Sequence, residues 1–327
     1  MRFGIVGTNF VSDMFMKAAS YVEEVKVVGV CSGRKENAIK FALKYDIENI
    51  YDDYISMLES GEIEAIYIAT PNVNHKKMTL EALKRKVPVF CEKPFAVNDK
   101  EVKEMVESSK KNNTYLHNGI VPLYTQNLQI IKDNLEKVGK IRKVTFSFCK
   151  YSSRYDAYLK GENPTTFRNE LANGSIMDLG IYVLSDAIAL FGKPKSLNAS
   201  AILLETQVDA CGTIILSYDE FEVVLLHSKV SDTEIVSEIS GEKGMIHFEI
   251  PSLINKVYLT LKEDNVKTQI SIDNEYPYMF QLKDFVKNVK EGNIESNKVP
   301  HSLSILIHEI LTEARKQSGV IYKEDNI

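Results

Sequence analysis

The sequence has no tryptophan and only four cysteines, and the cysteines are too scattered for a disulfide framework or a thiolate metal site. They are Cys31, Cys91, Cys149 and Cys211, with no Cys-x-x-Cys pair among them. The six histidines show no His-Glu-x-x-His spacing. We therefore expect the cysteines to be core or strand residues, and we expect no bound metal.

Clusters of one charge and long apolar runs are also missing. The formal net charge is -5, and Lys and Arg form no cluster interleaved with aromatic residues, which disfavours a nucleic-acid partner. The apolar run at Met1–Gly7 is too short for a signal peptide, and no later stretch is expected to match a membrane span. These absences predict a cytoplasmic protein without a membrane partner.

The composition is that of an ordinary globular protein. Of 327 residues, 44% are hydrophobic and 26% are charged, which is enough apolar material for a sizeable core. A chain of this length exceeds one typical domain, so we expect two.

The dinucleotide fingerprint Gly-x-Gly-x-x-Gly is incomplete. After a predicted strand at 1–6 its three places hold Gly7, Asn9 and Ser12, and a helix is expected over 13–22. Asn tolerates left-handed backbone and Ser is small, so the helix N-terminus can still receive a pyrophosphate. The alternative is a turn that serves packing alone. The candidate cofactor residues of this turn are Gly7, Thr8, Asn9 and Phe10.

The second predicted strand, 25–31, ends in Ser32-Gly33-Arg34-Lys35. An acid near this place would hold the ribose 2′-hydroxyl of NAD, whereas Arg accommodates the 2′-phosphate of NADP. Ser32, Arg34 and Lys35 therefore favour NADP, with NAD still possible. The alternative is that both bases merely begin the predicted helix 35–45 in solvent.

Two further predicted strands, 65–69 and 87–91, end in polar residues. A helix over 54–60 precedes the first of them, and a helix over 76–86 separates the two. This alternation predicts a doubly wound parallel sheet, an α/β Rossmann domain over 1–119. Ligands bind at the carboxyl ends of such strands, so Lys93 in Glu92-Lys93-Pro94 should point at the ligand. The alternative for Glu92 and Lys93 is a surface ion pair.

From residue 143 onward, strand-like runs follow one another without intervening helices. This pattern predicts a C-terminal α+β domain over 120–327 with a large, mostly antiparallel open sheet. The expected strands are 144–150, 197–204, 212–218, 222–228, 234–240, 245–249 and 257–262, and the expected helices are 178–191, 278–291 and 302–318.

Four motifs in order resemble the glucose-fructose oxidoreductase / inositol dehydrogenase (Gfo/Idh/MocA) family over essentially the whole chain. They are Gly7-x-Asn9, Thr70-Pro71-Asn72-x-x-His75, Glu92-Lys93-Pro94 and Asn173-Gly-Ser-Ile-Met-Asp178-Leu-Gly-Ile-Tyr182. The resemblance implies cofactor-side roles for Thr70, Pro71, Asn72, His75 and Glu92, and it brings Lys93 to the nicotinamide and the substrate oxygen. A lone His before a helix is also compatible with a capping or surface role.

The family's Asp-x-Gly-x-His pattern falls on Asp178, Gly180 and Tyr182, with Tyr in place of the usual His. This is similar to the glucose-fructose oxidoreductase and dimeric dihydrodiol dehydrogenase branch, where the phenol is regarded as the proton-transferring group. Hydride transfer between alcohol and carbonyl also requires a proton carrier, and an adjacent ammonium such as Lys93 favours the phenolate. The resemblance therefore implies Lys93, Tyr182 and Asp178 as catalytic residues.

The residues of the second motif also have ordinary interpretations. Asp178 and Tyr182 are four apart and would share a helix face toward substrate, but Tyr182 could be a core residue and Asp178 a helix N-cap. Arg168 precedes the motif at the family's usual spacing and is a candidate for substrate contact, or else a solvated side chain.

Together these features predict an NADP-preferring oxidoreductase, with NAD possible, that acts on a sugar, polyol or related vicinal diol. The family's usual contact surface further implies a homodimer or homotetramer through the C-terminal sheet. Two alternatives remain: a non-catalytic NAD(P)- or sugar-binding sensor on the same fold, and an enzyme that uses the cofactor transiently for elimination or epimerisation.

Overall fold

The computed structural model describes residues 1–273 and 275–326, and the chain forms two compact units. The first comprises Met1–Ile120 and Tyr276–Ile305, and the second comprises Val121–Glu275 and Leu306–Ile327. Two consecutive domains were expected, so the return of 276–305 to the first unit is a correction. Its cause is α9 (Tyr278–Lys290), whose Leu282 and Phe285 are buried in the first unit's core.

The first unit is built on a six-stranded sheet of order β3-β2-β1-β4-β5-β6 in which every neighbouring pair is parallel. This confirms the doubly wound Rossmann sheet. The strands are β1 (Arg2–Val6), β2 (Lys26–Cys31), β3 (Asn49–Tyr51), β4 (Ala65–Ile68), β5 (Val89–Glu92) and β6 (Leu116–Gly119).

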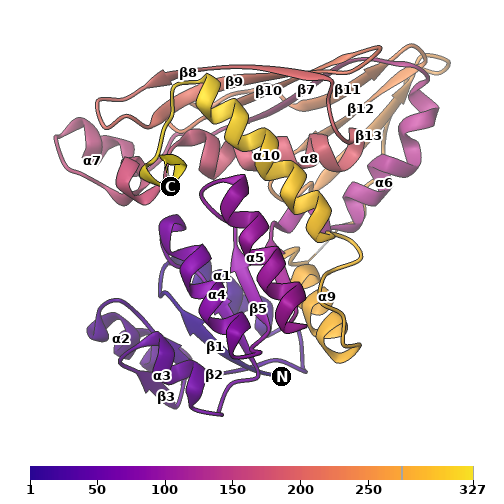
Figure 1. The fold of residues 1–327 in the computed structure, drawn as a ribbon. Coiled ribbons are helices and arrows are strands. Elements are labelled where there is room, and N and C mark those ends of the chain that lie inside the picture. Colours follow the sequence, from indigo (N-terminus) through magenta and orange to yellow (C-terminus); the bar gives the residue numbers. More distant parts are fainter. Residues whose placement is uncertain (274, 327) are drawn as a thin grey trace. The chain divides into compact units, whose positions relative to one another are not determined.

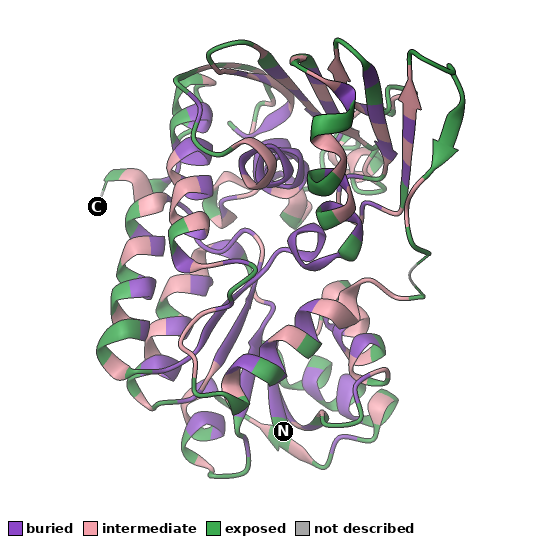
Figure 2. Ribbon diagram, turned by 90° about the vertical axis from the view of Figure 1, so that its right-hand side faces the viewer, coloured by how far each residue is buried: buried purple, intermediate pink, exposed green. Residues whose placement is uncertain are grey.

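Helices cover both faces of this sheet because alternate strand residues point to opposite sides. In β1, Phe3 and Ile5 join one apolar core, whereas Val6 joins the other. Figure 2 shows the helices with buried residues on one side and exposed residues on the other. They are α1 (Phe10–Ala19), α2 (Lys35–Tyr45), α3 (Tyr54–Glu59), α4 (His75–Lys84), α5 (Asp99–Asn112) and α9.

The second unit contains an eight-stranded sheet of order β14-β13-β12-β11-β7-β10-β9-β8. All neighbouring pairs are antiparallel except β7 and β10, which confirms a mostly antiparallel sheet. The strands are β7 (Ile141–Cys149), β8 (Ser196–Leu203), β9 (Asp209–Ser217), β10 (Glu222–Ser228), β11 (Ser237–Gly241), β12 (Gly244–Glu249), β13 (Lys256–Leu261) and β14 (Lys267–Gln269).

β11 begins at Ser237, three residues later than the expected strand 234–240. The reason is topological: β10 and β11 lie on opposite sides of β7, so residues 229–236 must cross the end of β7. Ser237 Oγ then accepts a hydrogen bond from the Ser147 amide at 3.2 Å, where β11 meets β7.

One face of the second sheet is covered by α8 (Ile181–Phe191) (Figure 1). The other helices of this unit are α6 (Gln126–Asn134), α7 (Tyr155–Leu159) and most of α10 (His301–Gln317). Eight consecutive residues of α8, from Ile181 to Ile188, are buried. A helix that is buried all round carries an apolar sequence all round.

This burial corrects one expectation. The stretch Asn169–Phe191, 23 residues long, is long and apolar enough by length and composition to cross a membrane, although no such stretch was expected. In this structure 72% of its most apolar window is buried inside the protein. Its apolar character is therefore explained by its place in the second unit's core.

Candidate active site

The predicted cofactor residues follow the carboxyl ends of four neighbouring strands in the first unit. The strand ends are level, since Val6 pairs with Cys31 and with Ile68, and Ile68 pairs with Cys91. Gly7, Ser32, Thr70 and Lys93 come one or two residues later, on the same edge of the sheet. This edge is where a doubly wound sheet binds its ligand.

Gly7 occupies a position that a side chain cannot share. Its φ is +99°, and a Cβ atom there would lie 2.2 Å from the carbonyl oxygen of Ala69. Its amide donates to the carbonyl of Cys31 at 3.0 Å. The turn after β1 therefore packs directly on the loop after β4.

Asn9 occupies the place of the second fingerprint glycine, and there it caps a helix. Its backbone is extended (φ -92°, ψ -175°), so Asn9 does not use the left-handed conformation that asparagine tolerates. The side chain caps α1, accepting from the amides of Val11 at 3.1 Å and Ser12 at 3.4 Å, and it donates to the Ala69 carbonyl at 2.8 Å. Helix α1 consequently begins at Phe10, three residues earlier than expected.

The turn fits a dinucleotide phosphate. Within residues 1–273 and 275–326, the backbone amides of Thr8, Asn9 and Phe10 donate to no protein acceptor. The Phe10 side chain is 72% exposed, and the Thr8 hydroxyl lies 3.2 Å from that of Ser32 after the neighbouring strand. Unpaired amides at a helix N-terminus are suited to bind an anion.

The two bases after β2 differ in their surroundings. Arg34 is exposed beside Ser32, and its side chain makes no capping hydrogen bond to α2. The Lys35 ammonium lies 2.8 Å from Asp52, and this hydrogen bond raises the pKa of Lys35. Arg34 is thus the better placed of the two for a ribose 2′-phosphate.

His75 joins the loops that follow β4 and β5. It is buried, with Nδ1 2.8 Å from the carbonyl of Pro94 and Nε2 2.9 Å from the carbonyl of Thr70. Burial is the largest influence on its ring and lowers its pKa. In the same loop Pro71 is exposed and Asn72 is buried in a short 3₁₀ turn. His75 is therefore a buried link rather than a surface residue.

Glu92 ends β5 as a buried carboxyl rather than as half of a surface ion pair. The hydroxyl of Tyr67 donates to Oε1 at 2.6 Å, and the Lys93 amide approaches Oε2 at 3.3 Å. Burial raises the pKa of Glu92 to about 6, against the opposing effect of the Tyr67 hydrogen bond. Lys93 follows, half-buried, and its peptide bond to Pro94 is cis.

In the second unit, Asp178 and Tyr182 lie on one continuous helical segment that is irregular at its start. Asp178 belongs to a π-helical turn, Ile176–Gly180, so it is not the N-cap of a helix that begins at 178. Tyr182 lies in the first turn of α8, 8% exposed, with its ring centre 5.7 Å from that of Phe148 in β7. The sequence predicted the segment but not its π turn.

Lys229, which the sequence analysis missed, donates its ammonium to Asp178 Oδ2. The Lys229 side chain is only 7% exposed, whereas that of Asp178 is 38% exposed. A signal was present: Val223, Leu225 and His227 are the buried alternate residues of β10, and Lys229 continues that alternation.

A buried polar network beneath the π turn holds it in place. Asp209 Oδ2 accepts from the Ile176 amide at 2.6 Å, and a Cβ on Gly174 would lie 2.2 Å from Asp209 Oδ1. His227 Nδ1 is 2.9 Å from the Ser175 hydroxyl. Burial raises the pKa of Asp209 to about 6 and lowers that of His227 to about 3. Both residues come from strands and were also missed.

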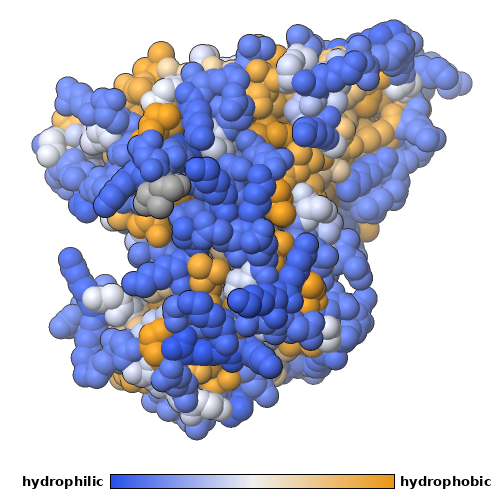
Figure 3. All heavy atoms as spheres, viewed as in Figure 1, coloured by the Kyte–Doolittle hydropathy of each residue, from blue (hydrophilic) through white to orange (hydrophobic). Residues whose placement is uncertain are grey.

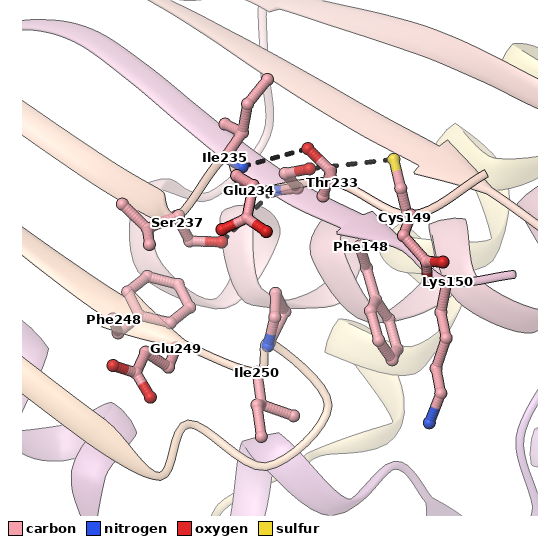
Figure 4. Close-up of a pocket in the computed structure, with 14 residues that line it drawn as sticks. Phe148, Cys149, Lys150, Thr233, Glu234, Ile235, Ser237, Phe248, Glu249 and Ile250 are labelled. Atoms are coloured by element: carbon pink, nitrogen blue, oxygen red, sulfur yellow. Dashed lines mark hydrogen bonds between the residues drawn. The ribbon is translucent and has the colours of Figure 1, made fainter.

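Arg168 is turned toward its own loop, where its guanidinium donates to the carbonyl of Asn163. A pocket of about 430 Å³ lies in the second unit where β7 and β12 end and β11 begins. Phe148 lines this pocket as well as contacting Tyr182, and Figure 4 shows its ring pointing to the same side as Ile250. Among the described residues, no three His, Cys, Asp or Glu side chains are grouped to hold a metal.

Both units have matches among known protein families. Residues 1–120 match the oxidoreductase family with an NAD-binding Rossmann fold, and residues 130–247 match the GFO/IDH/MocA C-terminal domain. The chain is 38% identical over 326 residues to scyllo-inositol 2-dehydrogenase (NADP(+)) of Bacillus subtilis, covering 99% of each. It is 27% identical over 342 residues to trans-1,2-dihydrobenzene-1,2-diol dehydrogenase of Danio rerio, covering 100% of this chain and 99% of the relative.

Among solved structures, the 3-ketoreductase KijD10 of Actinomadura kijaniata, in complex with NADP and TDP-benzene, superposes with a TM-score of 0.87. The two share 17% sequence identity, and the match covers 98% of this chain and 99% of that one, so it supports the fold. Matches to both domains and an alignment over nearly the full length confirm the resemblance inferred from the four motifs. The chain belongs to the GFO/IDH/MocA family of oxidoreductases.

Proposed function

We propose that this protein is an NADP-preferring dehydrogenase, also able to use NAD, that oxidises or forms a hydroxyl group on a sugar, polyol or vicinal diol. The observation that carries the proposal is the π turn with α8, which presents the ion-paired carboxylate of Asp178 four residues before the Tyr182 phenol. The inositol and dihydrodiol dehydrogenases that are similar over their full length act on the same kind of group.

The bound nicotinamide would supply hydride acceptance or donation at the substrate carbon. We assign to Tyr182 the transfer of the proton to or from the substrate oxygen. We assign to Lys93 the stabilisation of the charge that develops on that oxygen. Asp178, ionised and held by Lys229, would accept a hydrogen bond from a neighbouring hydroxyl and so orient the substrate.

The cofactor would be held by the turn and loops at the first sheet's edge. The amides of Thr8 to Phe10 suit the pyrophosphate, and Arg34 suits the 2′-phosphate of NADP. Asn72, His75 and Glu92 would shape the loops after β4 and β5, because each is buried there.

The test follows reduced-nicotinamide absorbance with NADP and NAD against inositols, aldoses and dihydrodiols. Tyr182→Phe and Lys93→Ala should each lower kcat by about 10²–10⁴ while NADP still binds. Lys290→Met, which breaks an exposed ion pair with Glu24 in the first unit, is the matched control and should leave turnover unchanged. Turnover that survives in both site variants would overturn the residue roles, and tight NADP binding without turnover on any ligand would favour a sensor.

We further propose that the open face of the second sheet joins copies of this chain into a homo-oligomer. On that face Val224 and Leu226 of β10 are half-buried, and Val224 lies opposite Ile215 of β9. Ile202 is 67% exposed, and Figure 3 shows hydrophobic residues among hydrophilic ones on the surface of the protein. Light scattering should show a dimer or tetramer that Leu226→Asp dissociates, and a monomeric wild type would contradict the proposal.

A further inference from the structure

Lys229 is a buried cation that the proton and hydride steps do not use. It follows β10 directly, its amide donates to the carbonyl of Ala210 at 2.9 Å, and its ammonium donates to Asp178. The backbone hydrogen bond ties Lys229 to β9, so the base of the side chain is anchored to the sheet. Its ammonium is brought to Asp178 from a rigid element rather than from a loop.

A buried ammonium is costly unless a carboxylate pairs with it, and Lys229 has two carboxylates near it. Asp178 is the direct partner, and the attraction of Lys229 is among the effects that oppose the burial-driven rise in the pKa of Asp209. Lys229 therefore pairs with a half-exposed carboxylate, and its charge also acts on a fully buried one. The positive charge faces inward, and the exposed member of the pair is the carboxylate of Asp178.

This arrangement has a consequence for the charge of the ligand. A carboxylate or phosphate on a substrate would meet Asp178 first and would be repelled, because the lysine is already paired and covered. A neutral hydroxyl can donate to the Asp178 carboxylate without that repulsion. Without Asp178 the same lysine would attract an anion.

We propose that the Asp178–Lys229 pair makes this site selective for uncharged polyols over sugar acids, with Lys229 as the positioning residue that fixes Asp178. The proposal rests on the proposed function, since it concerns the ligand of the same site. It also assigns Lys229, on a strand end about fifty residues from the motif, a role in specificity.

The test compares D-glucose with D-glucuronate, which differ by one carboxylate. Affinities are measured by isothermal titration calorimetry on the NADP-saturated protein, and the readout is the ratio of the glucuronate to the glucose dissociation constant. The wild type should prefer glucose. Asp178→Asn removes the carboxylate but keeps the Lys229 charge and should lower the ratio by about tenfold or more, whereas Lys229→Met removes the ammonium but keeps the Asp178 charge and should raise it.

Three further variants separate specificity from damage to the fold. Lys229→Arg restores the positive charge and should return the ratio toward the wild-type value. The double variant Asp178→Asn/Lys229→Met removes both charges and should give a ratio between those of the single variants. Lys290→Met, which removes a charge from an exposed pair with Glu24, should leave the ratio unchanged. Thermal unfolding of each variant checks that it is folded.

The inference is overturned if the two single variants shift the ratio in the same direction, if neither shifts it, or if the wild type binds neither sugar or binds glucuronate at least as tightly as glucose. Loss of stability alone would weaken binding of both sugars and leave the ratio where it was. An absence of turnover on the polyol panel, with the ratio still moving in opposite directions, would overturn the proposed function and leave the specificity of the site intact.

Discussion

The two units hold their candidate residues by different means. In the first unit, these residues are fixed mainly through main-chain atoms: Gly7 packs on the carbonyl of Ala69, and Asn9 caps α1 and donates to the same carbonyl. In the second, Asp178 and Tyr182 are held by Asp209, His227 and Lys229, which come from strands thirty to fifty residues further along. The first arrangement relies on the backbone, and the second relies on buried side chains from neighbouring strands.

The difference predicts how each unit responds to change. A turn that is fixed by backbone contacts is sensitive to substitution at one or two positions and tolerant elsewhere. A site held by buried polar groups is sensitive at every member of the network, because removing one member leaves its partner buried and unpaired. Substitutions that separate these two behaviours test the comparison directly.

The largest effects are expected at two glycines. Gly7→Ala and Gly174→Ala each place a Cβ 2.2 Å from an oxygen at positive φ, and each should lower the free energy of unfolding by about 3 kcal/mol or more. The obstacle at Gly7 is the Ala69 backbone, whereas at Gly174 it is the Asp209 side chain. Denaturant unfolding should therefore show partial rescue of Gly174→Ala by Asp209→Ala.

Gly33→Ala is the control for both, since nothing lies within 4 Å of a Cβ at that position. It should change stability by less than about 0.5 kcal/mol. Failure of Asp209→Ala to relieve any part of the Gly174→Ala loss would show that backbone strain, rather than the buried network, dominates at Gly174.

Next in size is the pH dependence that two buried carboxyls impose on stability. The pKa values of Glu92 and Asp209 are raised to about 6 in the folded protein, from ordinary values of 4.5 and 3.8. The folded state thus holds protons that the unfolded state has released, so these groups make stability fall as pH rises from about 4 to 6. Over this pH range each carboxyl lowers the free energy of unfolding by up to about 2–3 kcal/mol.

Glu92→Gln should flatten that slope, and so should Asp209→Asn, as measured by urea unfolding between pH 4 and pH 7. Substrate affinity separates the two units: Asp209→Asn should disturb it through the Ile176 contact, and Glu92→Gln should disturb NADP affinity instead. A slope unchanged in both variants would mean that other groups set the pH dependence.

At Asp186 in α8 we expect a smaller effect on stability, and here the substitution should stabilise the protein. This carboxyl is fully buried, and within the described residues neither oxygen has a hydrogen-bond partner, so burial raises its pKa well above the ordinary value. Asp186→Leu should stabilise the protein by about 1–3 kcal/mol, because it removes an unpaired polar group from the core. A rise in Tm with Tyr182-dependent turnover retained is the expected result, and a fall in Tm would show that the carboxyl makes a required contact.

The smallest effect concerns two adjacent bases in the first unit. Arg34→Ser should weaken NADP binding about tenfold relative to NAD, since a charge-assisted hydrogen bond to the 2′-phosphate contributes roughly 1.5 kcal/mol. Lys35→Ser should change it less, because Lys35 is engaged by Asp52. Fluorescence titration with both cofactors gives the ratio, and equal losses in the two variants would remove the distinction between them.

The same contrast explains what could be predicted from sequence. The strands and most helices of the first unit follow from alternating apolar runs, and the α2 bounds were predicted to the residue. The capping role of Asn9 was not predicted, because the apolar pattern placed the start of the helix three residues too late. β3 and β6 were not predicted, because strands of three and four residues leave a weak periodic signal. α5 was also not predicted, although Val102, Met105 and Val106 have the spacing of one buried helix face.

In the second unit the motif was visible but its support was not. Nothing in the local sequence distinguishes Asp209, His227 and Lys229 from other polar residues. Their role becomes visible only when β9 pairs with β10 and α8 packs on the sheet. That information lies in contacts between distant segments, to which local propensity is blind. The continuation of the buried alternation from His227 to Lys229 was the one signal within reach of sequence reasoning.

The return of residues 276–305 to the first unit bears on how the protein is made. During synthesis the N-terminal 120 residues leave the ribosome first, but α9 supplies Leu282 and Phe285 to their core. More than half of the remaining chain must therefore be synthesised before α9 can cover the apolar surface of the nucleotide fold. We expect a nascent chain stalled before residue 276 to resist proteases poorly, and one extended past residue 305 to gain protection in that first segment.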